Sequence, residues 1–161
     1  MEKGATFTAT PEYTFDGATP ESADLAKKLD ALDMSYTSSD SAVLVVDEDG
    51  NMVAVSAGTA EVALSSKDGK ITASKTIEVV VTPTDITTTD TLTLTAGEAA
   101  TLETAVAPAD ATHVVISYTS SDNSVATVSD TGEVEAVGAG EADITAAVQD
   151  TELSAVCKIT V

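Results

Sequence analysis

One stretch of this chain is used twice. The 45 residues Ser35–Val79 recur without a gap 82 positions later, as Ser117–Val161. Both copies open with Ser-Tyr-Thr-Ser-Ser-Asp, and matching valine, alanine and glycine positions continue to the last residue of each copy. Self-similarity at a fixed period means that one structural unit is built twice. The sequence therefore predicts two domains, residues 1–81 and 82–161, each near the low end of the size that folds independently.

Composition favours β-structure and excludes several classes of partner. Valine and threonine, which suit half-buried pleated surfaces, are abundant, and Trp is absent. The formal net charge is −20, from 27 acidic and 7 basic residues. Nucleic acids and anionic membranes attract Lys-rich and Arg-rich surfaces, so we expect no nucleic-acid partner and no binding to anionic membranes. No apolar stretch is long enough for a membrane span, and we expect no membrane insertion and no signal peptide in this chain.

Short segments in which apolar and polar residues alternate, bounded by Gly or Pro, predict the strands of the second copy. Pro108 ends one of them because proline cannot continue a hydrogen-bonded ladder. Ser129–Gly132 predicts a hairpin connection. The number and spacing of the segments predict an all-β sandwich. The expected strands are 86–89 with 92–95 as a broken first strand, 101–107, 114–118, 125–128, 133–137, 142–148 and 154–161.

The first copy departs from this pattern before Ser35. Ala5–Thr10, which ends at Pro11, looks like the counterpart of the strand that ends at Pro108. On that interpretation the first copy's own first strand is missing or lies upstream. Because the second copy ends on its last strand, we expect the chain to be a monomeric piece of a longer protein.

An insertion in the first copy has the pattern of a helix. Thr19 is a suitable N-cap and Pro20 suits the first helical position. Leu25, Leu29 and Leu32 then fall on one helical face. The sequence predicts a short amphipathic helix over about 19–32, inserted between strands of the first domain.

The motifs of the second copy resemble a family. Residues 86–161 resemble a group 2 bacterial immunoglobulin-like domain, residues 35–79 do so more loosely, and residues 12–34 depart from the pattern. Tyr36 and Tyr118 stand where that family usually has Trp. The matching motifs are Leu92–Glu98, Ala105–Asp110, Ser117–Asp122, Val125–Val128, Gly132, Ala136–Gly140 and Cys157–Val161.

This resemblance implies a fold and a range of functions. It implies two tandem immunoglobulin-like sandwiches, of a kind found in bacterial surface proteins, adhesins, extracellular polysaccharide-degrading systems and some phage virion proteins. The family supplies no catalytic residues to carry over. It also implies an extracellular or cell-surface location.

The acidic string Asp47–Asn51 has the composition of a calcium loop. A helix-flanked calcium loop needs ligands at alternating positions over 12 residues. Val45 occupies the place of the first acid and a strand follows, so we interpret the string as a hairpin turn with Gly50 in a left-handed conformation. Weak calcium binding by the clustered carboxylates stays open as an alternative.

Other residue types suggest chemistry only weakly. His113 is the one histidine and precedes a strand, so we expect a solvated loop residue rather than part of a triad. Cys157 alternates with Lys158 and Thr160, which places its thiol on the inward face. Gly58 and Gly140 look like chain reversals rather than phosphate loops.

Two further possibilities involve side chains near the insertion or on strands. Tyr13 and Phe15 flank the insertion and would suit a sugar platform, although core packing is the simpler interpretation. Side-chain amide cross-links would require Lys75 or Lys158 to meet an asparagine, and the candidates are Asn51 and Asn123.

These observations predict no enzyme and no catalytic, metal-binding or cofactor residue. The leading hypothesis is a bacterial surface module that spaces or presents other domains, with an adhesion role carried by the insertion at Asp16–Asp33. Its partners would be host or plant glycans or surface proteins. The alternatives are a carbohydrate-binding module and a phage virion decoration domain.

Overall fold

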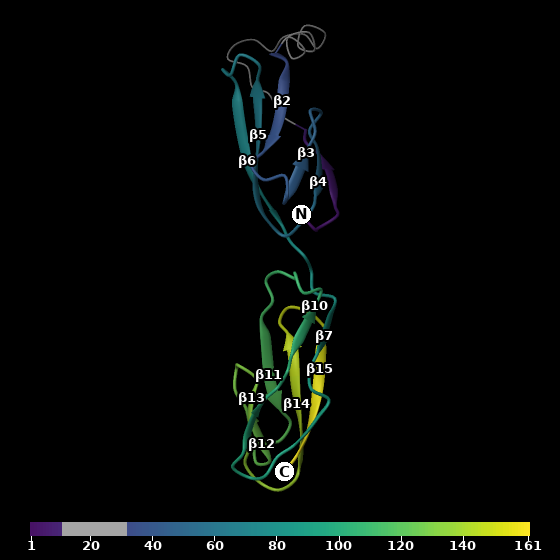
Figure 1. Ribbon diagram of the computed structural model, residues 1–161, viewed down its shortest axis with the longest axis vertical. Helices are drawn as coiled ribbons and strands as arrows, with labels where there is room; N and C mark the ends of the chain where they lie inside the picture. Colours follow the sequence, from purple (N-terminus) through teal and green to yellow (C-terminus); the bar gives the residue numbers. More distant parts are fainter. Residues whose placement is uncertain (11–31) are drawn as a thin grey trace. The chain divides into compact units, whose positions relative to one another are not determined.

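A computed structural model describes residues 1–10 and 32–161 of the chain. The chain divides into two compact units, unit 1 (Met1–Val81) and unit 2 (Thr82–Val161). Both are built from short β-strands, as predicted (Figure 1). The helix predicted over 19–32 falls, apart from its last residue, outside the described residues.

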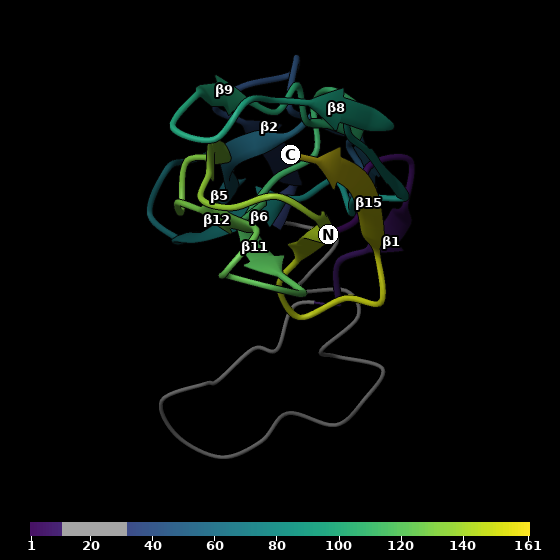
Figure 2. The same ribbon diagram turned by 90° about the horizontal axis from the view of Figure 1, so that it is seen from below.

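Unit 2 contains a four-stranded sheet, a three-stranded sheet and a two-stranded ribbon. The sheets have the strand orders β11-β14-β15-β8, β12-β13-β9 and β10-β7. All pairs are antiparallel except β15 with β8, where β8 lies parallel beside β15 at the edge of the sheet (Figure 2). The strands are β7 (Asp85–Thr87), β8 (Thr91–Thr93), β9 (Ala99–Thr101), β10 (Ala105–Ala107), β11 (Ile116–Ser120), β12 (Ala126–Val128), β13 (Glu133–Ala136), β14 (Glu141–Val148) and β15 (Ser154–Thr160).

The core of unit 2 forms where the two larger sheets meet. Inward residues of β14 and β15, such as Ile144 and Cys157, pack against Val134 of the opposite sheet, and all three are fully buried. A second buried cluster lies under the β10-β7 ribbon and centres on Ile86. The ring of Tyr118 contacts both clusters. The strict alternation of β14 thus supplies one continuous apolar face, as period-2 patterning requires.

Unit 1 repeats the two larger sheets, one of them with one strand fewer. The orders are β2-β5-β6 and β1-β4-β3. Between them lies one buried cluster, centred on Leu44 and including Met52, Val62 and Val79. The strands are β1 (Thr6–Thr8), β2 (Met34–Ser38), β3 (Leu44–Val46), β4 (Asn51–Ala54), β5 (Gly58–Ser66) and β6 (Thr72–Val79).

The strand predicted over 101–107 is wrong as a single element. β9 ends at Thr101 in the sheet with β13, whereas Ala105–Ala107 forms β10 and pairs with β7. Between them Leu102 turns into the core with 5% of its surface exposed. The broken first strand is confirmed, because β7 and β8 belong to different sheets.

The counterpart proposed for Ala5–Thr10 is also corrected. Backbone hydrogen bonds align Met1–Thr10 with residues 94–103, so β1 corresponds to β9 and not to the segment that ends at Pro108. Consequently the described part of unit 1 has no counterpart of β7, β8 or β10. The matching bonds run from Gly4 to Ala54 and Gly97 to Ala136, and from Ala9 to Gly50 and Leu102 to Gly132.

Candidate functional site

The Asp47–Asn51 string forms a hairpin turn, as predicted. Gly50 has a φ of 81°, in the left-handed region, and a Cβ there would lie 2.8 Å from the ring of Tyr36. The carboxylate of Asp47 accepts the amides of Asp49 at 3.0 Å and Asn51 at 2.8 Å. Its second oxygen accepts the side-chain amide of Asn51 at 2.8 Å. Its oxygens therefore serve the turn itself.

Those hydrogen bonds give the turn a pH dependence. The bonds from Asn51, first of all from its side chain, lower the pKa of Asp47 from its ordinary value. Because the folded-state pKa is lowered, the ionised carboxylate stabilises the fold at any pH above its unfolded pKa of about 3.9. This stabilisation is lost as the pH falls through the folded-state pKa. We therefore expect urea unfolding of wild type and Asp47→Ala to differ at pH 6 and to converge toward about pH 2. A difference independent of pH would contradict this role for the carboxylate.

His113 lies in the loop between β10 and β11 and is exposed. It has a φ of 55°, so it helps the chain reverse there. Among the residues the structure describes, no three His, Cys, Asp or Glu side chains gather in a way that would hold a metal ion.

Cys157 is fully buried on β15, on the inward face that the sequence predicts. Burial, with a smaller contribution from the charge of Asp90, raises the pKa of its thiol. Because the thiolate is the reactive form, we expect the native chain to react very slowly with a thiol reagent such as DTNB. The reaction should become fast in urea, at the unfolding of unit 2. Fast modification of the native chain would contradict this burial.

The remaining predicted candidates do not come together in the described residues. Neither Lys75 nor Lys158 shares a hydrogen bond with Asn51 or Asn123 there, and Asn51 instead binds Asp47. Tyr13, Phe15 and nearly all of the Asp16–Asp33 insertion lie outside the described residues. Asp33 itself forms an exposed ion pair with Lys67 at 2.8 Å.

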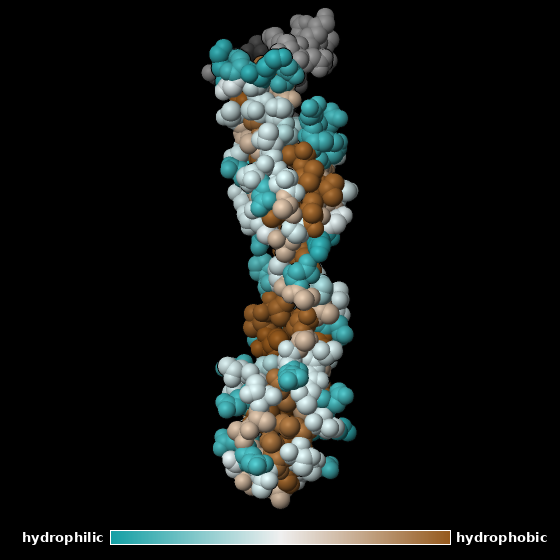
Figure 3. Space-filling view, viewed as in Figure 1, coloured by the Kyte–Doolittle hydropathy of each residue, from teal (hydrophilic) through white to brown (hydrophobic). Residues whose placement is uncertain are grey.

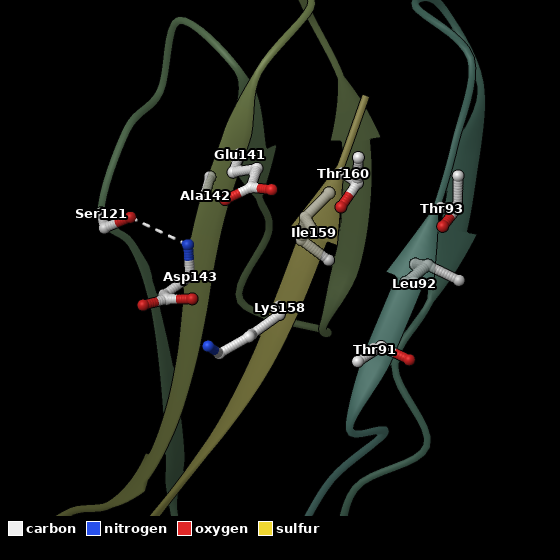
Figure 4. A pocket seen from close by; sticks show the side chains of 10 residues that line it. All are labelled: Thr91, Leu92, Thr93, Ser121, Glu141, Ala142, Asp143, Lys158, Ile159 and Thr160. Carbon is white, nitrogen blue, oxygen red and sulfur yellow. Dashed lines mark hydrogen bonds between the residues drawn. The ribbon is translucent and has the colours of Figure 1, made fainter.

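Unit 2 has a shallow polar hollow on the outer face of β14, β15 and β8 (Figure 4). Asp143 and Lys158 are cross-strand partners on its floor. The hydroxyl of Ser121 accepts the amide of Asp143 at 2.9 Å, and in unit 1 Ser39 and Glu61 make the same bond at 2.8 Å. Since this bond occurs in both copies, we assign it to the fold.

Unit 1 has an apolar hollow that the sequence analysis missed. This β6 groove has a volume of about 340 Å³ and opens beside β6. The side chain of Phe7 lines it and is 56% exposed. The signal in the sequence was Lys75, which replaces the buried Cys157 of the second copy. The groove is lined by Phe7, Ala9, Thr10, Tyr36, Met52, Val62, Leu64, Ala73, Ser74, Lys75 and Ile77.

A second apolar surface of unit 1 lies over β3 and β4 (Figure 3). Val45 and Val53 are cross-strand partners there, each 43% exposed. Scattered surface valines are usual on β-sandwiches and do not by themselves indicate a partner. No helix in the described residues is long and apolar enough to cross a membrane.

Comparison with known proteins identifies the family. The sequence matches the bacterial Ig-like domain (group 2) family over residues 16–77 and again over residues 80–159. The chain belongs to this family. The two successive matches in this chain agree with the internal repeat of its sequence.

Individual relatives are similar over parts of their length. An Ig-like virion protein of Serratia phage KSP90 is 44% identical over 72 residues, which cover 44% of this chain and 28% of the phage protein. An uncharacterized protein of Clostridium acetobutylicum is 30% identical over 129 residues, covering 78% of this chain and 13% of that protein. The chain thus spans less than a third of either relative. Domains 4–9 of the surface layer protein SbsC match 80% of this chain and 22% of the SbsC chain at 23% identity, with a TM-score of 0.46.

Proposed function

We propose that this chain is a non-enzymatic module of a surface protein, which spaces or presents neighbouring domains outside the cell. The observation that carries the proposal is the family match of both successive units. The net charge of −20 fits a solvent-facing module, because such charge favours solubility over association.

A specific observation favours one alternative, a module of a phage virion. The similarity to the phage Ig-like virion protein is 44% over 72 residues, higher than the 30% shared with the bacterial relative. In either setting the module would be one part of a longer protein exposed to solvent. A carbohydrate-binding role has less support, since only five residues of the chain are aromatic and a sugar platform is built from exposed rings.

The location can be tested directly with an antibody against this chain. Immunogold labelling should mark intact cells of the source bacterium, or intact particles of a phage that it releases, without permeabilisation. Labelling of cells alone would favour the bacterial setting, and labelling of particles the virion setting. Labelling only after permeabilisation would overturn the proposal.

An adhesion role is tested separately. The labelled chain is screened against glycans and matrix proteins, with calcium and with chelator. The test variant replaces Asp16–Asp33 with a Gly-Ser segment of equal length, and the control variant replaces the unit 2 loop 109–113 in the same way. A saturable hit lost only in the test variant makes the chain a binding module. Silence across the array leaves spacing and presentation as the function.

A further inference from the structure

An early strand of unit 2, β8, lies side by side with the last strand, β15 (Figure 4). The two strands pair in parallel, with Thr91 opposite Lys158. Backbone bonds extend this pairing at both ends. The amide of Lys158 donates to the carbonyl of Asp90, and the amide of Leu94 donates to that of Thr160, each at 2.9 Å. One continuous ladder therefore joins the first part of the unit to its last strand.

Parallel pairing fixes the direction in which tension would load this ladder. The chain enters unit 2 beside β7 and β10, at one end of the sandwich, and its last residue lies at the other end (Figure 1). β15 runs toward that second end, and β8 runs the same way. Tension along the chain would therefore pull β8 back toward the first end and β15 toward the second. The two strands would have to slide past each other.

Sliding loads all the hydrogen bonds of the ladder at the same time. The bonds of a parallel pair run across the strands at a slant, so a force along the strands strains every one of them. If the same strands were pulled apart from one end, the bonds would instead open one after another, each at its own small cost. Because forced unfolding is governed by the unfolding barrier, the direction of the load decides how fast the unit gives way.

Both strands of the ladder are anchored in unit 2. Leu92 and Leu94 of β8 pack against the buried cluster that contains Ile159, which is 1% exposed. β15 pairs with β14 along its whole length, and Val161 then exchanges two backbone bonds with Gly140, at 3.0 and 3.1 Å. β15 is thus held between β14 and β8, and β8 is the strand whose release opens the ladder.

The strand before β8 belongs to a smaller sheet. β7 pairs with β10 in a two-stranded ribbon, and the amide of Thr84 donates to the carbonyl of Ala107 at 2.7 Å. This ribbon has no third strand to support it, so we expect it to open first under load. The tension then passes to β8 and to its ladder with β15.

We propose that unit 2 bears tension, and that the ladder between Asp90–Leu94 and Lys158–Thr160, the β8–β15 clamp, is the part that resists it. The clamp keeps the rest of the sandwich folded until the whole ladder shears. A module that presents other domains at a surface needs this resistance when its far end is held. That use rests on the proposed function, whereas the clamp is a property of the fold and is measured without reference to location.

The direct test compares two directions of pulling on the full chain by single-molecule force spectroscopy. One handle is attached after Val161, and the other to the thiol of either Thr82→Cys or Ala96→Cys. Thr82 and Ala96 are exposed, whereas Cys157 is fully buried and does not compete for the handle. Pulling from position 82 slides β8 along β15. Pulling from position 96 opens the same ladder from one end, and in both cases unit 1 stays outside the loaded path.

The clamp predicts a large difference between these directions. At equal force, rupture should be at least about tenfold slower when the strands slide than when they are opened from one end, since several bonds must then yield together. The two proteins share every residue of β8 and β15, so the comparison needs no change in the clamp. Equal rupture rates in the two directions would overturn the proposal.

Proline substitutions test the bonds of the clamp. Leu94→Pro removes the amide that donates to Thr160 and should speed rupture in the sliding direction by about tenfold at equal force. Thr93→Pro is the matched control, because the neighbouring amide of this edge strand points away from β15 and proline is tolerated there. Its effect should be less than about threefold. Equal acceleration by both variants would contradict the assigned bonds.

A general loss of stability is distinguished by Tyr118→Ala. Tyr118 lies on β11, at the opposite edge of the sheet from β8. This variant should lower the melting temperature of unit 2 yet speed rupture less than Leu94→Pro does. If it speeds rupture as much, the force reports only overall stability and the clamp is wrong. Labelling of intact cells or particles tests the proposed function separately, so either proposal can fail while the other stands.

Discussion

Replacing Leu44 by alanine should lower the free energy of unfolding of unit 1 by about 3–5 kcal/mol, the usual cost of a Leu-to-Ala cavity in a packed core. Leu44 is fully buried at the centre of the unit 1 cluster, against Met52 and Val62. Against a total stability of about 5–15 kcal/mol, such a loss brings a small domain close to unfolding. Urea unfolding, followed by NMR signals assigned to each unit, measures the change.

The matched control is Val45→Ala, one residue along the same strand. Val45 points outward and is 43% exposed, so its truncation should cost less than about 1 kcal/mol. The transition of unit 2 should not change in either variant, because each unit has its own core. Equal losses in both units after Leu44→Ala would show that they unfold as one, contrary to the two-domain prediction.

Replacing Tyr118 by alanine should lower the free energy of unfolding of unit 2 by about 2–4 kcal/mol. The ring packs on both buried clusters of the unit and covers Gly132, whose added Cβ would lie 3.0 Å from the ring. Large aromatic truncations in cores cost about 3–5 kcal/mol, and the partial exposure of Tyr118 reduces that figure. Calorimetry of the full chain measures the shift of the unit 2 transition.

Tyr118→Phe is the control, because it keeps the ring and removes only the hydroxyl. It should cost less than about 1 kcal/mol. If phenylalanine costs as much as alanine, the hydroxyl and not the packed ring anchors this position, and the assigned role of Tyr118 is wrong.

Much of the fold followed from local signals. Period-2 alternation located strands such as β14 and β15. The hairpin at Ser129–Gly132 followed from its glycine, which has a φ of 78°. These features depend on residues close together in sequence, so pattern alone was sufficient to predict them.

Pairing between strands was not predictable in the same way. Residues 101–107 alternate like one strand, yet β9 ends at Thr101 and β10 joins β7 in another sheet. Ala5–Thr10 has the alternation of either β9 or β10, and only the hydrogen bonds of Gly4 and Ala9 decide between them. Periodicity says which face a residue takes but not which neighbour a strand pairs with.

The candidate site was missed for a related reason. Lys75 in place of Cys157 was visible in the repeat. Its surroundings depend on β8, a strand that lies 64 or more positions earlier than Cys157 in unit 2 and has no described counterpart in unit 1. Comparison of the two copies in three dimensions supplied what a comparison of their sequences did not.

The most direct test of this account compares two amides in one sample of the full chain. Native-state hydrogen exchange reports whether the amide of Lys158 on β15 and that of Thr76 on β6 are protected. The account predicts slow exchange at Lys158, which donates to Asp90, and exchange at least about tenfold faster at Thr76. Equal protection at both positions would show that the edges of β6 and β15 are covered alike, and would contradict the difference between the two units.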